Sequence, residues 1–292
     1  MNRVNKSVPT YELLYIVGII AISFSSIFVR WSSADAAVIG MYRLLLTTLL
    51  LMPFVWKYRH DLFHLTAKQW TLVSLSGIML GLHFLLWMAS LAYTTVASST
   101  VILTLEPVMV MLGSYLLFRT KTNRMMLLGM GIAMIGSIII GSGDFKLSGD
   151  ALFGDVLSFL GTIAVAIHML IGKQLRNNMG AFTYNFWVFL TAGISLAIYN
   201  AIKGNSFTGY SAKEWGIFLL LAVVSTIFGH YLFNWLLKYM KATTVSMAVL
   251  GEPVIASILA WMLLKEALNI YQMAAGILIL FGVWLFLRHG KE

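Results

Sequence analysis

The chain has 292 residues, of which 60% are hydrophobic and only 11% are charged. Soluble domains carry about 25% charged residues, so this composition excludes a soluble enzyme, a secreted disulfide scaffold and a disordered chain. The excess apolar surface needs lipid as its solvent, which predicts an integral membrane protein. The net charge of +9 includes no long basic run, so we expect no nucleic-acid partner, and the absence of cysteine excludes disulfides and thiolate chemistry.

Apolar stretches of spanning length alternate with short polar breaks along the whole chain. A bilayer span needs about 20 residues, and no segment left over is long enough for a soluble domain. We see no cleavable signal peptide, so the first stretch is expected to remain as a helix. The sequence thus predicts an all-α membrane protein with ten transmembrane helices, near 11–29, 36–56, 69–91, 94–117, 124–141, 150–171, 181–202, 214–237, 242–264 and 270–287.

The Lys and Arg residues predict an orientation for these helices. With the N-terminus inside, 14 of them fall in cytoplasmic segments and 5 on the outer side, while Arg43 lies within a helix. Positive residues accumulate in cytoplasmic loops. We therefore expect a multi-pass protein of the cell membrane with both termini in the cytoplasm and the lipid bilayer as its surroundings.

An internal repeat divides the chain. Residues 88–108 (MASLAYTTVASSTVILTLEPV) and 234–254 (NWLLKYMKATTVSMAVLGEPV) align without gaps at an offset of 146, which is half the chain length. Both segments carry a Glu-Pro pair at the same position. Because each half holds five helices, an odd number, the second half has to insert in the opposite orientation. We expect two inverted halves, 1–145 and 146–292, an architecture that recurs in secondary transporters with a site at the midplane.

This arrangement resembles the EamA type of the drug/metabolite transporter superfamily, in which each half closes with a Glu-Pro helix and a Gly-containing final helix. Further matching positions are Arg43 in GMYRLLL, Gly154-Asp155, and Leu263-Leu264-Lys265-Glu266, whereas Thr120 departs from the pattern at the first-half equivalent of Glu266. The resemblance implies movement of metabolites by alternating access, often export of amino acids. Members that this chain resembles include aromatic amino acid exporters.

Glu106 and Glu252 fall near the midplane of their expected helices, where a buried carboxylate is costly. One interpretation is a proton-coupling or substrate-amine site. The alternative is that each Glu caps backbone groups freed by the following proline. Pro107 and Pro253 cannot donate a backbone hydrogen bond, so we expect them to kink or hinge the two helices.

Polar residues share one face on each of the third and eighth expected helices. His83 and Trp87 lie on the first of these faces, and His230 and Asn234 on the second, with the two histidines at near-equivalent positions of the repeat. Polar groups on a spanning helix rarely face lipid, so we expect both faces to line a central cavity. For Trp87 an interfacial anchor is the alternative to an aromatic cavity wall.

Three further positions complete the candidate cavity residues. Arg43 lies roughly 10 Å below the outer end of its expected helix. It has three open interpretations: snorkelling outward, a structural role as an ion pair with Asp35 or Glu106 or as a carbonyl clamp, or contact with a substrate carboxylate. His168 and Ser26 are lesser candidates, and Ser99 is added as a further hydroxyl.

The sequence also argues against several site types. His60 and His64 lie in a loop without a third ligand nearby, so we expect no metal site. The turn that begins at Gly141 lacks the lysine-hydroxyl ending of a phosphate loop, which excludes ATP-driven transport by this chain alone and leaves no cofactor expected. Glycines in the fifth and tenth helices predict close helix packing or a dimer face, so monomer and homodimer both stay open: Gly129, Gly131, Gly136, Gly276 and Gly282.

Together these patterns predict a secondary active transporter rather than an enzyme. We expect an exporter or exchanger of small metabolites, with amino acids, aromatic ones included, as the first candidates and nucleobases or drugs as others. Transport is expected to be either proton-coupled or facilitated. A membrane channel and a non-transporting membrane protein are the alternatives, since a polar lining does not by itself demonstrate alternating access.

Overall fold

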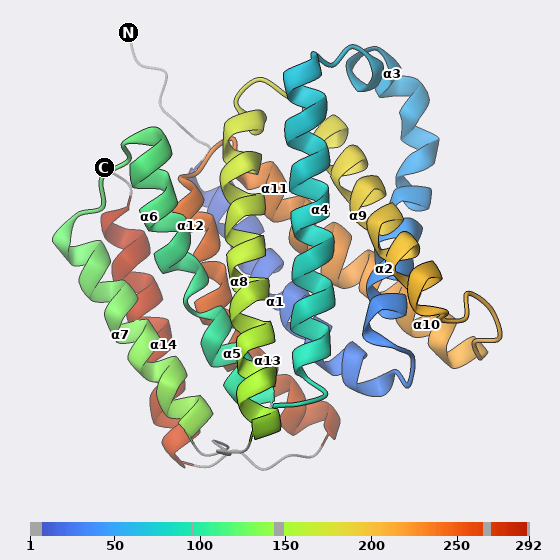
Figure 1. Ribbon diagram of the computed structural model, residues 1–292. Helices are drawn as coiled ribbons and strands as arrows, with labels where there is room; N and C mark the ends of the chain where they lie inside the picture. The colour runs from blue at the N-terminus through green and yellow to red at the C-terminus, as the bar shows by residue number, and fades with distance from the viewer. Residues whose placement is uncertain (1–7, 95, 143–148, 265–269, 291–292) are drawn as a thin grey trace, which may run out of the picture.

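The computed structural model describes residues 8–94, 96–142, 149–264 and 270–290, and in this part of the chain every regular element is a helix (Figure 1). Within these residues, nine segments are long and apolar enough to cross a membrane. A tenth apolar segment, Arg124–Ile139, coincides with the fifth expected helix but is shorter. The all-helical membrane class is therefore confirmed. Lys265 and Glu266, which the family resemblance included, lie outside the described residues.

The helices follow the expected ranges closely, although several expected spans are built from two or three consecutive pieces. In chain order they are α1 (Val8–Trp31), α2 (Ala36–Leu51), η1 (Met52–Phe54), α3 (Val55–Phe63), α4 (Ala67–Ser90), α5 (Val96–Leu103), α6 (Glu106–Phe118), α7 (Arg124–Ser142), α8 (Gly149–Arg176), α9 (Ala181–Lys203), α10 (Ala212–Leu220), η2 (Leu221–Tyr231), α11 (Leu232–Leu236), α12 (Ala242–Ser246), α13 (Ala248–Leu264) and α14 (Ile270–His289).

Local sequence explains where these helices start and stop. Asp35 caps α2 by accepting a hydrogen bond from the Ala37 backbone N–H at 2.8 Å, and Thr66 and Gln69 form a capping box at the start of α4. Gly204 ends α9 in the left-handed conformation, with φ of 73°, which glycine adopts without steric cost.

Four spans depart from a regular α-helix, beginning with the second, in which the 3-10 helix η1 separates α2 from α3. The fourth expected span breaks at residues 104–105, between α5 and α6 and directly before Glu106. In the ninth span the break falls at Met247, and Pro253 lies inside α13. The eighth span contains η2, which is an 11-residue π-helix. π-Helical stretches are rare in proteins, and those that occur are often found at functional sites. The sequence patterns above did not predict this one.

Lipid-facing and buried surfaces separate clearly. Large apolar side chains such as Leu116 and Ile277 are 68% and 69% exposed, as expected where lipid is the solvent. In the interior, α1 packs against η2 and α13, and α8 packs against α4 and α6. The remaining long helices pair as α2 with α9 and α7 with α14. These contacts surround the centre of the bundle.

Glycines bring α7 and α14 into close contact. A Cβ atom at Gly129 would lie 2.6 Å from the Gly282 carbonyl oxygen, and one at Gly282 would lie 2.5 Å from the Ala133 nitrogen. Gly136 is similarly close to Ala275 and Ile279. Close helix packing within the chain therefore accounts for these three glycines, whereas Gly131 has open space around it.

This contact predicts a contrast between two substitutions on the same helix. Gly129→Ala forces backbone against backbone, so we expect the free energy of unfolding to fall by about 1–3 kcal/mol. Gly131→Ala has no such clash, and the gain in helix propensity leaves stability unchanged or raises it by up to about 1 kcal/mol. Thermal unfolding in detergent measures both variants, and equal midpoints would contradict the packing described here.

Candidate functional site

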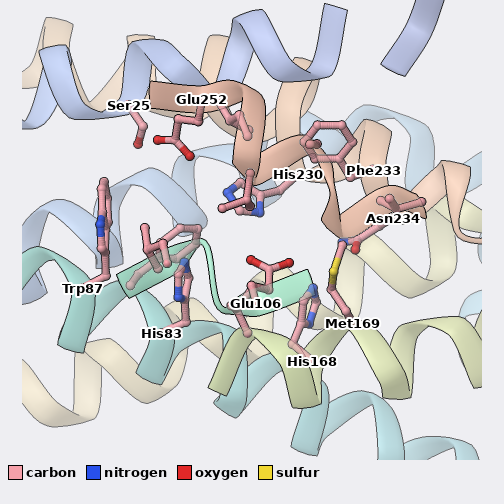
Figure 2. A pocket seen from close by; sticks show the side chains of 17 residues that line it. Ser25, His83, Trp87, Glu106, His168, Met169, His230, Phe233, Asn234 and Glu252 are labelled. Atoms are coloured by element: carbon pink, nitrogen blue, oxygen red, sulfur yellow. The ribbon is translucent and has the colours of Figure 1, made fainter. Parts of the chain in front are cut away.

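An internal cavity lies where α1, α4, α5, α6, α8, η2, α11, α12 and α13 meet (Figure 2). Its walls combine apolar side chains with a small number of polar groups, as is usual for small-molecule sites. The polar or titratable lining residues are Ser25, His83, Glu106, His168, His230, Asn234 and Glu252. Aromatic walls come from Phe84, Trp87 and Phe233.

The structure brings together most of the residues singled out from the sequence. Six of the nine predicted cavity residues line this one space: His83, Trp87, Glu106, His230, Asn234 and Glu252. The lesser candidate His168 lines it as well. The other three predicted residues, Ser26, Ser99 and Arg43, lie near it but are not part of its lining.

Ser26 is displaced from the cavity by its helical phase. Its hydroxyl donates to the Ser23 carbonyl oxygen of α1 at 3.3 Å. The preceding residue, Ser25, faces the cavity instead. Neighbouring residues on a helix point about 100° apart. Which of two adjacent serines faces the cavity therefore depends on the rotation of α1 about its axis, and the sequence pattern does not determine that rotation.

Ser99 is held in a hydroxyl network beside the cavity. It lies 2.8 Å from the Ser90 hydroxyl and donates to the Ser158 hydroxyl at 3.1 Å, while Ser158 donates back to the Ser99 carbonyl at 2.9 Å. These bonds tie α4, α5 and α8 together. Ser99 therefore has a packing role, and Ser98, one residue earlier, donates to Asp155 at 3.0 Å.

Arg43 is fully buried and clamps neighbouring helices behind the cavity wall. Its guanidinium donates to the Thr226 hydroxyl at 2.7 Å, to the Ser25 hydroxyl at 3.0 Å and to the Ser225 carbonyl at 3.3 Å. It also lies 4.1 Å above the ring of Phe84. The expectation of outward snorkelling is wrong because the side chain has 0% exposure, and its bonds go to hydroxyls and a carbonyl rather than to a carboxylate.

Glu106 and Glu252 direct their carboxyl groups into the cavity from opposite walls (Figure 2). They are 3% and 8% exposed. Glu106 is the first residue of α6, directly after the helix break, whereas Glu252 lies within α13. Among the described residues neither carboxyl group makes a hydrogen bond to a backbone group freed by the prolines, so the capping interpretation gains no support from the geometry.

Two of the three cavity histidines are positioned by hydrogen bonds to groups outside the lining, and the third by an aromatic contact within it. The Nδ1 atom of His83 lies 3.0 Å from the Gly161 carbonyl oxygen, which accepts a hydrogen bond from Nδ1–H and so leaves the lone pair of a neutral ring on Nε2. His168 Nδ1 lies 2.8 Å from the Ser76 hydroxyl. His230 comes from the π-helix and packs edge-on against Phe84 at 5.1 Å. The cavity thus has hydrogen-bonding imidazoles in fixed orientations.

Trp87 forms an aromatic wall of the cavity. It is 5% exposed and stacks on His83 with the ring centroids 6.3 Å apart, so the alternative of an interfacial anchor is excluded. Its indole N–H has no hydrogen-bond partner in the described part of the chain. The cavity therefore offers one strong donor, two carboxyl groups and several aromatic faces, and none of the described Lys or Arg residues contributes to its lining.

Polar contacts tie helix ends together on both sides of this cavity. At the end opposite the termini, Glu214 of α10 accepts hydrogen bonds from the Ser33 backbone N–H and hydroxyl, both at 2.9 Å, and from the Ser32 hydroxyl. At the other end Lys173 of α8 donates to the Leu237 carbonyl at 2.7 Å, beyond the last residue of α11. Hydrogen bonds between helices therefore fix helix ends on both sides of the cavity.

The helical bundle and its lipid-facing apolar surface define a multi-pass membrane protein with a partly polar internal cavity. The model of the EamA-like transporter family matches this chain twice, over residues 9–142 and 152–288. The chain belongs to the EamA-like transporter family.

Individual relatives agree with this assignment. The chain is 25% identical over 245 residues to the uncharacterized transporter YetK of Bacillus subtilis, covering 80% of this chain and 70% of that protein. It is 23% identical over 277 residues to an uncharacterized transporter of Archaeoglobus fulgidus, covering 95% and 96% of the two chains. One crystal structure superimposes with a TM-score of 0.81 over 97% of this chain and 98% of that one at 12% sequence identity, a similarity of fold alone.

The two adjacent serines of α1 provide a direct test of the cavity. In this cysteine-free chain, Ser25→Cys places a thiol in the cavity, and Ser26→Cys places one against the α1 backbone outside it. We expect a charged, water-soluble thiol reagent to modify the cysteine at position 25 much faster than the one at position 26. Mass spectrometry of the labelled protein measures both rates, and faster reaction at position 26 would place the cavity elsewhere.

Proposed function

We propose that this protein is a secondary transporter that moves a small metabolite by alternating access. The observation that carries the proposal is the buried cavity, to which Glu106 and Glu252, from equivalent positions of the internal repeat, both contribute a carboxyl group. In transporters built from inverted repeats, the substrate site lies near the midplane at the interface of the two repeats. Family membership and relatives named as transporters support the same class.

The proposed architecture is two inverted five-helix halves, residues 1–145 and 146–292, with ten spans in total. Helix contacts support it, because the first helix of each half packs against the third span of the other, α1 on η2 and α8 on α4. In the same way, the first helix of each half packs against the fourth span of the other half, α1 on α13 and α8 on α6. Equivalent helices also pair with each other across the halves, α2 with α9 and α7 with α14. This is the contact pattern of a pseudo-two-fold axis, as inverted repeats require.

In the proposed transport cycle the two halves rock about the helices that carry Pro107 and Pro253. The break before Glu106 lets α5 and α6 change their mutual angle without stretching regular backbone hydrogen bonds. The excess of Lys and Arg on one side supports a cell-membrane protein with both termini in the cytoplasm. The direction would be export or exchange.

We propose amino acids, aromatic ones included, as the substrate class. The carboxyl groups of Glu106 and Glu252 suit a protonated amine, and the faces of Phe84, Trp87 and Phe233 suit an aromatic ring. Arg43 is committed to Thr226, Ser25 and Ser225, so the substrate carboxylate would meet the Trp87 indole N–H rather than a guanidinium. Nucleobases and cationic drugs share enough of these features to be the alternative substrates.

Counterflow in proteoliposomes tests the proposal. Purified protein is reconstituted with an unlabelled amino acid inside, and a labelled mixture of aromatic and small neutral amino acids is added outside. A carrier gives transient uphill accumulation of label that depends on the internal amino acid, whereas a channel gives only equilibration. Flux that does not depend on the internal amino acid would contradict alternating access. If no flux occurs, amino acids are not the substrate, and nucleobases and drugs are tested in the same assay.

Two carboxyl substitutions make the test specific to the cavity. Glu106→Gln and Glu252→Gln keep the shape and remove the charge, and a hydrogen bond to a charged group contributes about 1.5–3 kcal/mol, so we expect exchange to fall about tenfold or more. Asp61→Asn, at an exposed carboxylate outside the cavity, is the matched control and should exchange at the unmodified rate. If both Gln variants exchanged at the unmodified rate, the two carboxyl groups would not be required for transport.

A further inference from the structure

Two histidines of the cavity are bonded across the contact between α4 and α8 in a reciprocal pattern. The Nδ1 atom of His83 on α4 lies 3.0 Å from the Gly161 carbonyl oxygen of α8. The Nδ1 atom of His168 on α8 lies 3.1 Å from the Ser76 carbonyl oxygen of α4. The two contacts are seven residues apart on each helix, which is about 10 Å along the axis. Each helix therefore fixes one ring of the other.

Close packing brings these carbonyl oxygens within reach of the rings. A Cβ atom at Gly161 would lie 3.3 Å from the Trp87 backbone nitrogen, so α8 runs directly against α4 at this point. Beside His168, the Ser76 hydroxyl lies 2.8 Å from the same Nδ1 atom and 2.7 Å from the Tyr184 hydroxyl. These three side chains are at most 2% exposed. Both rings are thus held by groups behind the cavity wall.

The carbonyl contacts determine which nitrogen of each ring carries the proton. A carbonyl oxygen only accepts hydrogen bonds, so a contact of this length with Nδ1 places the proton on Nδ1. The other tautomer would set a ring lone pair against a carbonyl oxygen inside a membrane-spanning bundle, where water does not compensate. Among the described residues no carboxylate is hydrogen-bonded to either ring, so both are neutral and carry one N–H. In both rings the lone pair is therefore on Nε2, away from the backbone contact.

Acceptors consequently outnumber donors among the polar groups of the lining. Two Nε2 atoms and the carboxyl groups of Glu106 and Glu252 are available to accept hydrogen bonds. On the donor side, the Trp87 indole N–H has no partner in the described part of the chain, and the Asn234 amide already donates to Asn185 at 2.8 Å. The cavity is thus matched to a ligand that brings donors.

We propose that His83 and His168 are specificity-determining residues, which accept hydrogen bonds from the substrate and so select a cation that bears N–H groups. In the view of Figure 2 the Glu106 carboxyl group lies between the two rings and supplies the opposite charge. A primary ammonium or a guanidinium has both the charge and the donors, whereas a quaternary ammonium has the charge alone and would leave the Nε2 lone pairs desolvated without a donor. The inference rests on the proposed function, because it names the substrate group that this same site recognises.

Nitrogen NMR reads the tautomers without any substrate. The full chain is prepared with isotope-labelled histidine and measured in proteoliposomes, and His83→Phe and His168→Phe assign the two signals by their loss. We expect both rings to be neutral with the proton on Nδ1. Ser76→Ala removes the hydroxyl and keeps the carbonyl group, so His168 should keep its tautomer in this variant. An Nε2–H tautomer or a doubly protonated ring at either position would overturn the inference.

Equilibrium binding to the purified protein in detergent tests the selectivity. The probes are phenylethylamine and its trimethylammonium derivative, which share the aromatic ring and the positive charge but differ in their N–H groups. We expect the unmodified protein to bind the primary amine about tenfold more tightly or better, because a hydrogen bond to a charged group contributes about 1.5–3 kcal/mol. His83→Phe and His168→Phe keep an aromatic ring and remove the acceptor, so each should lose most of this preference.

His64→Phe is the matched control, because it removes an exposed histidine outside the cavity and should keep the full preference. Steric exclusion of the three methyl groups would instead leave the preference intact in both cavity variants. That result, equal affinities of the unmodified protein for the two probes, or binding of neither probe would overturn the inference. Counterflow with amino acids decides the proposed transport function separately.

Discussion

Lipid offers no hydrogen bonds to polar groups of a spanning helix, so each such group has to find its partner inside the bundle. Arg43 shows how strongly this constraint acts, because its guanidinium is bonded to α1 and to η2 and is excluded from lipid. Thr47, one turn further along α2, reaches the Ala222 carbonyl of η2 at 3.2 Å. The Ser225 and Ala222 carbonyls of η2 therefore accept hydrogen bonds from α2 side chains. The backbone hydrogen bonds of this π-helix follow a wider spacing than those of an α-helix.

The consequence of this clamp extends into the cavity. Because α2 holds η2, it also sets the position of His230, and the contact of Arg43 with Phe84 links the same clamp to the aromatic wall. The binding surface thus depends on a charged group that does not belong to it. Support of this kind from outside the site is what keeps side chains in a defined orientation.

Much of the fold was predictable because the bilayer imposes length and polarity on every span. The expected ranges differ from the observed helices by only a few residues at most ends. His83, His230 and Asn234, which helical periodicity predicted to face inward, line the cavity. That Ser25 rather than Ser26 lines the cavity, and that Ser99 bonds to other serines beside it, depends on how each helix is rotated about its axis. The spacing of polar residues does not determine that rotation. The role of Arg43 and the π-helix required tertiary contacts that no local pattern encodes. The two equivalent Glu-Pro motifs lie at different distances from the breaks in their spans: Glu106 directly follows its break, whereas Glu252 lies inside α13. The surrounding packing rather than the proline therefore decides where regular helical hydrogen bonding ends.

The central claim is that the two halves move reciprocally around the cavity, and distances at the two ends of the bundle test it most directly. Since the chain has no native cysteine, spin labels can be attached in pairs at Tyr93 and Lys213 on one end and at Lys121 and Lys238 on the other, all of them exposed. Pulsed electron paramagnetic resonance in lipid then reports both distances with and without the amino acid mixture. Alternating access predicts that one distance lengthens as the other shortens. Two distances that stay fixed, or that change in the same sense, would contradict it.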